Sequence, residues 1–268
     1  MQRLIERVMK EKLRKDSGEI IFASLFGSYR RGDYDAFSDI DLFVVYEDEE
    51  AITPNSIKCL ERMLNRKIHL TLFDFREFEK RVRFNDYLTA SIIEDSSFIL
   101  GRRDIFSEAK RNVLEKLPNE ESIRFNRQIG FKMIEHVYSY LDALSPRRPR
   151  DHEDLLNRVV KGLNDYRLAL GYIYASRLMQ RSRRSVSYAY LAETSIGSTL
   201  KEIIRMEKVL KRKSKIDHAL LRKLAEDIKV RSLQILSLNR SSAEKLVSSV
   251  ELQHAKPSFS SIKNRINF

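Results

Sequence analysis

The sequence has a single cysteine and no long apolar run, and both absences narrow the class of protein. Cys59 is the one cysteine among 268 residues, which excludes an internal disulfide. The five histidines are scattered and give no spacing typical of a zinc site. No stretch approaches the roughly 20 apolar residues that a membrane-spanning helix needs, and residues 1–15 lack the apolar segment of a secretory signal. We therefore expect a cytoplasmic protein without a membrane partner.

Acidic residues are scarce in the second part of the chain. Residues 1–106 carry 18 Lys and Arg against 20 Asp and Glu, whereas residues 107–268 hold the other 32 of the 50 basic residues and 18 of the 38 acidic ones. The formal net charge of +12 therefore comes from the C-terminal part. Such an asymmetry favours an anionic partner, and we expect nucleic acid there. Exposed basic helix faces that bind nothing are the alternative explanation.

The hydrophobic pattern predicts an α/β domain at residues 1–106 and an all-α, basic helical domain at residues 107–268. Short apolar segments predict strands at 19–26, 40–46 and 67–73. Helices are expected at 2–15 and from Pro54 to Leu64. Beyond the first domain the periodicity is helical, over 120–144, 151–180, 198–213, 217–236 and 242–252. The segment 145–150 contains two prolines and cannot lie inside a helix.

A glycine–serine turn follows the first predicted strand. Gly27 lets the backbone come close to a ligand, and Ser28 begins a short helix whose amides favour an anion. Arg30 and Arg31 add guanidinium donors that suit phosphate oxygens. These residue types in this order predict a site for the phosphates of a nucleotide.

Two aspartates begin the next predicted strand. Asp39 and Asp41 are two positions apart, so both side chains leave the same face of the strand. Neighbouring carboxylates repel each other unless a cation lies between them, and their hard oxygen ligands suit Mg²⁺, with Mn²⁺ as the alternative. A metal beside a phosphate site suits in-line phosphoryl or nucleotidyl transfer.

The stretch LFGSYRRGDYDAFSDIDL, at residues 25–42, resembles the DNA polymerase beta nucleotidyltransferase superfamily, whose signature is a Gly-Ser turn followed by a D-x-D strand. The resemblance covers residues 20–75 well and extends loosely to 106. This superfamily includes the minimal and the antibiotic-modifying nucleotidyltransferases. It implies an N-terminal nucleotidyltransferase domain, with a mixed sheet flanked by helices, followed by a helical domain.

The resemblance also implies roles for single residues. The protein would transfer a nucleoside monophosphate from an NTP to an acceptor hydroxyl on nucleic acid, a small molecule or a protein. Asp39 and Asp41 would bind the metals and act in catalysis. The residues implied to bind the nucleotide are Gly27, Ser28, Arg30, Arg31 and Ser38.

A third carboxylate, usual on a neighbouring strand in this superfamily, is replaced in this sequence. Its position falls on His69, with Thr71 as the alternative, whereas Asp74 is better explained as the N-cap of a helix. A neutral His69 can accept the proton of the attacking hydroxyl. It can equally pack beside Thr71, or mark a catalytically degenerate nucleotide-binding module whose basic helical domain binds RNA or a protein partner. The acceptor, the NTP and the oligomeric state stay open.

Overall fold

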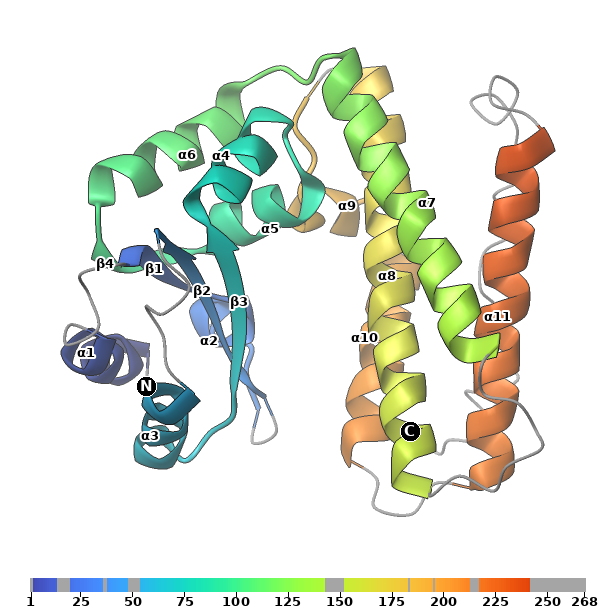
Figure 1. Ribbon diagram of the computed structural model, residues 1–268, viewed down its shortest axis with the longest axis horizontal. Coiled ribbons are helices and arrows are strands. Elements are labelled where there is room, and N and C mark those ends of the chain that lie inside the picture. Colours follow the sequence, from blue (N-terminus) through green and yellow to red (C-terminus); the bar gives the residue numbers. More distant parts are fainter. Residues whose placement is uncertain are drawn as a thin grey trace. The chain divides into compact units, whose positions relative to one another are not determined.

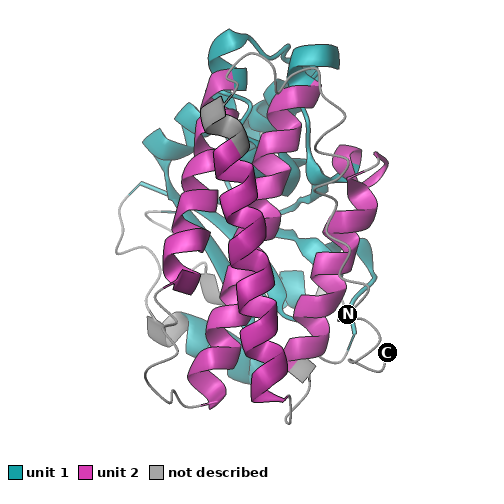
Figure 2. Ribbon diagram, turned by 90° about the vertical axis from the view of Figure 1, so that its right-hand side faces the viewer, with its two compact units in different colours: residues 1–123, 179–189 teal, residues 124–178, 190–268 magenta. Residues whose placement is uncertain are grey.

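The computed structural model describes residues 2–13, 20–35, 38–47, 54–142, 152–182, 184–194, 196–212 and 217–241 (Figure 1). The chain divides into two compact units (Figure 2). The first comprises residues 1–123 and 179–189, and the second comprises residues 124–178 and 190–268. The first unit extends past residue 106, where the sequence analysis placed a domain boundary. Helix α6 (Arg103–Glu115) belongs to it because Phe106 packs edge-on against Phe22 of the sheet.

The first unit is built on a four-stranded mixed sheet with the strand order β3-β2-β1-β4. Its strands are β1 (Ile20–Phe26), β2 (Ile40–Tyr46), β3 (Ile68–Asp74) and β4 (Ser97–Gly101). The central strand β1 is antiparallel to both β2 and β4, whereas β2 and β3 are parallel. The mixed sheet predicted from the sequence is confirmed. The edge strand β4 was not assigned from the sequence.

Helices cover both faces of this sheet (Figure 1). On one face lie α1 (Gln2–Leu13) and α3 (Pro54–Leu64), which share an apolar cluster with Ile40, Leu42 and Val44 of β2. On the other face α4 (Phe75–Arg83), α5 (Tyr87–Asp95) and α6 share a cluster with Phe43 and Val45. Strand β2 is therefore apolar on both sides over most of its length, as is usual for an interior strand. A polar residue at its start, Asp41, marks the place where this burial ends.

The second unit consists of long helices, as predicted (Figure 2). The long helices are α7 (Glu120–Asp142), α8 (His152–Ser182), α10 (Gly197–Arg212) and α11 (His218–Ser241), and a short helix, α9 (Tyr188–Ala192), lies between α8 and α10 in the sequence. Helices α7 and α9 begin, and α8 ends, in residues of the first unit. Tyr166 and Tyr172 of α8 are fully buried. Burial raises the pKa of Tyr166 far above its ordinary value, because the phenolate would lose its hydration.

Two expectations for the helical part lie outside the described residues, namely the break at 145–150 and the helix at 242–252. No helix within the described ranges combines the length and the apolar character needed to cross a membrane.

Candidate functional site

The turn after β1 brings Gly27 against Asp41. Gly27 has φ of 72°, a left-handed conformation that favours glycine, and it begins the short helix α2 (Gly27–Arg31). Phe26 and Asp41 are register partners on the antiparallel strands β1 and β2, so the aspartate lies beside the turn. A Cβ atom added to Gly27 would stand 2.0 Å from Oδ2 of Asp41. Both the backbone conformation and the space therefore require glycine here.

His69 lies beside Asp41 on the parallel strand β3. The two residues are register partners, and Nδ1 of His69 is 3.2 Å from Oδ1 of Asp41. The imidazole is 66% exposed, so it does not pack in the apolar core. If the ring carries its proton on Nδ1, it donates to the carboxylate and keeps the basic lone pair on Nε2. The structure thus places His69 where the sequence expected the third carboxylate, while its role stays a prediction.

Asp39 precedes β2 directly and is half-buried. Within the ranges that the structure describes, no cluster of three or more His, Cys, Asp or Glu side chains could hold a metal ion. Mg²⁺ is commonly bound through one or two carboxylates, with phosphate oxygens of the substrate completing its shell. Asp41, beside the turn at Gly27, and Asp39, two positions before it, therefore suit Mg²⁺ that is bound together with a nucleotide, without forming a complete metal site by themselves.

The remaining predicted nucleotide-binding residues have different surroundings. Ser28 is the second residue of α2, and its carbonyl accepts the N–H groups of Gly32 (2.9 Å) and Asp33 (3.1 Å). Arg30 is half-buried, and its Nε is a buried donor without a hydrogen-bond partner among the described residues. An unpaired buried donor costs about 1–3 kcal/mol, so this atom fits an anion that arrives from outside the chain.

Ser38 closes the loop before the aspartates. Its hydroxyl accepts the N–H of Asp35 at 2.9 Å and donates to Oδ1 of the same residue at 3.2 Å. These contacts join Ser38, the residue before Asp39, to Asp35. The Ser38 hydroxyl therefore has a structural role, whereas its contact with a nucleotide stays a prediction.

Asp95, at the end of α5, is the site residue that sequence reasoning missed. Its Oδ2 accepts hydrogen bonds from the N–H of Gly27 at 3.1 Å and from Nη1 of Arg31 at 2.5 Å. Burial lowers the pKa of the Arg31 guanidinium, but the charges of Asp95 and Asp33 outweigh burial and raise it above its ordinary value. Arg31, predicted to bind phosphate, is thus paired within the protein. Nothing local in the sequence signals a partner 64 positions away.

Asp74 lies at the other end of β3 and does not belong to the site. It is the N-cap of α4, and its Oδ1 accepts the N–H of Glu77 at 2.8 Å. Its register partner is Tyr46, at the far end of β2 from Asp41. The prediction that Asp74 caps a helix is therefore confirmed, and no carboxylate of β3 competes with His69 for the place beside Asp41.

Comparison with known proteins gives a family for this arrangement. Residues 6–129 match the model of the nucleotidyltransferase domain. No curated protein sequence matches the chain. Among solved structures, spectinomycin adenyltransferase from Enterococcus faecialis, determined with ATP and spectinomycin, is 15% identical with a TM-score of 0.42, and covers 86% of this chain and 99% of its own.

Two further solved structures resemble parts or most of the chain. A nucleotidyltransferase-like protein from Exiguobacterium sibiricum is 11% identical with a TM-score of 0.37, and the match covers 97% of this chain and 90% of its own. The complex of a tri-AMPylated Shewanella oneidensis HEPN toxin with its MNT antitoxin contains a chain that is 19% identical, with a TM-score of 0.29 and coverages of 42% and 83%. Because all three TM-scores are below 0.5, these structural similarities do not indicate the substrates or partners of this chain. The match identifies residues 6–129 as a nucleotidyltransferase domain, and with this domain the chain is an enzyme of the nucleotidyltransferase class.

Proposed function

We propose that the protein transfers a nucleoside monophosphate from an NTP to an acceptor hydroxyl, with Mg²⁺ held by Asp39 and Asp41. The observation that carries this proposal is the position of the Asp41 carboxylate, which lies between the backbone of Gly27 and the imidazole of His69. One carboxylate thus adjoins both the group proposed to hold the triphosphate and the group proposed to accept a proton. A solvent-exposed D-x-D pair without these neighbours would not support the proposal.

The turn at Gly27 would hold the β- and γ-phosphates of the NTP. The first turn of α2 has backbone N–H groups without partners inside the helix, and Ser28 adds a hydroxyl. The unpaired Nε of Arg30 is a further donor for a phosphate oxygen. Asp95 would hold the turn in shape through Gly27 and Arg31, so that the donors are positioned before the nucleotide arrives.

Asp39 and Asp41 would bind Mg²⁺, which neutralises the charge of the triphosphate when bound. His69 would accept the proton of the attacking hydroxyl, since a neutral imidazole is a base at physiological pH. Hydrogen bonding of Nδ1 to Asp41 would orient the ring. In this way a histidine can perform the proton transfer without a third carboxylate.

Nucleic acid is the acceptor that the charge of the chain favours. Residues 107–268 carry an excess of 14 basic residues, the difference between 32 and 18. Lys and Arg that neutralise phosphates gain affinity by releasing counterions. We propose that the basic helical part contributes to binding this acceptor.

The proposal is tested by incubating the full chain with each of the four NTPs labelled at the α-phosphate, with Mg²⁺ and with RNA or a protein extract. Label should enter an acceptor with the wild type and not with a variant that carries Asp39→Asn and Asp41→Asn. Binding of Mg-NTP by calorimetry, without label transfer to any acceptor, would instead identify a nucleotide-binding module that has lost catalysis. Absence of both binding and transfer would contradict the proposal entirely.

A further inference from the structure

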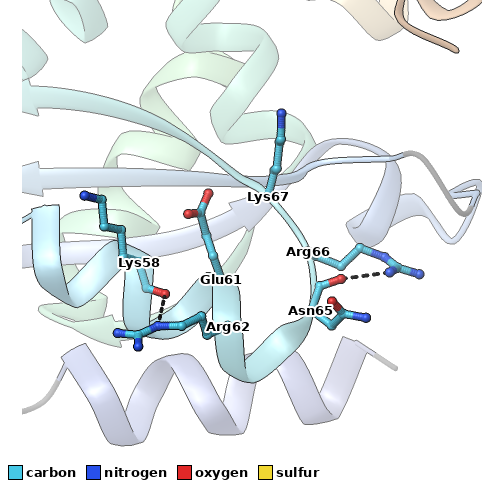
Figure 3. A pocket seen from close by; sticks show the side chains of 6 residues that line it. All are labelled: Lys58, Glu61, Arg62, Asn65, Arg66 and Lys67. Carbon is cyan, nitrogen blue, oxygen red and sulfur yellow. Dashed lines mark hydrogen bonds between the residues drawn. The ribbon is translucent and has the colours of Figure 1, made fainter. Parts of the chain in front are cut away.

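A basic depression lies at the junction of α3 and β3 in the first unit (Figure 3). Six residues line it, namely Lys58, Glu61, Arg62, Asn65, Arg66 and Lys67. Its volume is about 670 Å³, well within the range of ligand sites and far more than one phosphate group fills. Asn65, with φ of 48°, turns the chain so that the end of the helix and the start of the strand meet in this place.

The four cations of this depression have no ion-pair partner within the described part of the chain. Arg62 donates through Nε to the carbonyl of Lys58 at 3.3 Å, and Nη1 of Arg66 donates to the carbonyl of Asn65 at 2.8 Å (Figure 3). These partners are neutral. Cations gathered without carboxylates repel one another, and an anion removes this cost.

Glu61, the one acidic residue of the lining, is engaged elsewhere. Its Oε1 accepts the N–H of Ile68, at the outer edge of β3, at 3.0 Å. The carboxylate therefore satisfies a backbone donor of the edge strand and helps to close the helix onto the sheet. A net excess of three positive charges remains in the depression.

The depression adjoins the aspartates of the proposed catalytic site. The carbonyl of Lys67 accepts the N–H of Ile40 at 2.9 Å, and Ile40 follows Asp39 directly. On the next pair along the parallel strands, Asp41 stands opposite His69. Arg66 reaches the turn itself, because its Nε donates to the hydroxyl of Tyr29 in α2 at 2.9 Å. Lys67 thus lies two residues before His69 on the edge strand, and Arg66 contacts the turn, whereas α3, which carries Lys58 and Arg62, covers the opposite face of the sheet from Asp41.

We infer that the depression binds the phosphodiester backbone of a single-stranded nucleic acid whose terminal hydroxyl is the acceptor. This inference rests on the proposed function and names its substrate class. The size of the depression fits more than one phosphate, and the cations are exposed apart from Arg66, as contacts to a flexible backbone require. The triphosphate of the NTP is proposed to bind at Gly27. The cations of the depression are therefore available to bind the acceptor.

The test removes three of the charges and leaves Arg66, which contacts Tyr29. The pocket variant carries Lys58→Gln, Arg62→Gln and Lys67→Gln. A control variant removes three exposed cations of the same unit outside the depression, through Lys10→Gln, Arg76→Gln and Arg111→Gln. Both lose the same charge, so a non-specific effect of net charge would be equal in the two.

The measurement is the affinity for a fluorescent single-stranded RNA of mixed sequence over a series of salt concentrations. Each phosphate contact on a single strand contributes about −0.7 to the slope of log K against log salt, so the pocket variant should lose about 2 units of slope. At 0.1 M salt this corresponds to an affinity lower by on the order of 100-fold. The control variant should keep the slope and affinity of the wild type.

Equal losses in the two variants, or no RNA binding by the wild type, would overturn the inference. Binding of Mg-ATP by calorimetry should be unchanged in the pocket variant. Label transfer to a non-nucleic acceptor, together with equal RNA affinities, would overturn the inference and leave the proposed function standing. Loss of RNA binding in the pocket variant alone, with no transfer by the wild type, would support the site and contradict the proposed function.

Discussion

The carboxylate of Asp41 lies against the α-carbon of Gly27, so closely that a methyl group on that carbon would meet Oδ2 at 2.0 Å. The relationship joins the proposed phosphate turn to the proposed metal ligand. Any side chain at position 27 must displace the aspartate, the turn or both.

Gly27→Ala should therefore abolish Mg-ATP binding. Gly32→Ala is its matched control, because Gly32 also has positive φ, 82°, but a Cβ there meets nothing within 4 Å. Alanine in this conformation costs about 1–2 kcal/mol at either position. Gly32→Ala should lose that much free energy of unfolding in urea titrations and keep its affinity in calorimetry, whereas Gly27→Ala should lose more, because its Cβ also meets Asp41. Equal affinities in the two variants would show that the contact with Asp41 does not matter for binding.

The second prediction concerns the aspartate pair. The double variant Asp39→Asn and Asp41→Asn should lose Mg²⁺-dependent binding of ATP and all transfer, because amides do not replace the charge of the carboxylates. Its fold should persist, since removal of like charges relieves repulsion. Calorimetry with Mg²⁺ and with a chelator measures the difference. The control Glu79→Gln and Glu108→Gln removes two exposed carboxylates from α4 and α6, and undiminished affinity in the aspartate variant would contradict the metal assignment.

The third prediction concerns Asp95, which joins the turn to α5. Asp95→Ala leaves the N–H of Gly27 and the guanidinium of Arg31 without their shared acceptor, at a cost of about 1 kcal/mol in unfolding free energy, given that both side chains are partly exposed. Asp33→Ala removes the longer and more exposed partner of Arg31, at 3.4 Å, and should cost less than about 0.5 kcal/mol.

Affinity for Mg-ATP separates two roles of Asp95. If the residue positions the turn, Asp95→Ala weakens nucleotide binding and Asp95→Asn, which keeps an oxygen acceptor for Gly27, restores part of it. If the carboxylate only competes with phosphate for the same donors, both variants bind the nucleotide more tightly than the wild type. The second outcome would contradict the positioning role that we propose.

Much of this fold could be predicted from the sequence because the relevant signals are local. Strand β2 and helix α3 match their expected bounds, since β-branched runs and Pro54 mark their ends. Strand β4 was missed because SFILG is too short to show a period. Helix α6 spans the boundary expected at residues 106–107 from the change to helical periodicity, and Phe106 of this helix is buried in the core of the first unit.

Only those residues of the candidate site that lie in or near one sequence motif could be predicted. Gly27, Ser28, Asp39 and Asp41 lie within a short stretch, and strand alternation was enough to bring His69 to the same face. Asp95 could not be predicted, because its contacts with Gly27 and Arg31 depend on how α5 packs. The basic depression likewise exists only once α3 and β3 are joined, although its cations are close in sequence.

The last prediction tests whether His69 accepts the proton of the attacking hydroxyl or takes no part in transfer. His69→Ala should leave Mg-ATP binding nearly unchanged and lower transfer by about 100-fold or more, the usual contribution of a general base. Thr71→Ala is the control, because Thr71 was the alternative position and its register partner is Phe43, away from the aspartates. It should not change transfer. Loss of transfer in Thr71→Ala alone would show that the assignment to His69 is wrong.

The pH dependence of transfer gives the sharper form of this test. Only the neutral form of an imidazole accepts a proton, so wild-type transfer should fall when the solution is made more acidic. His69→Asp replaces the base with a carboxylate that ordinarily protonates near pH 4, and it restores a third acidic ligand beside Asp41. The variant should therefore transfer at least as fast as the wild type near pH 7 and keep its activity to a lower pH than the wild type does. An unchanged acid limb in His69→Asp would mean that another group accepts the proton, even though the imidazole lies 3.2 Å from Asp41.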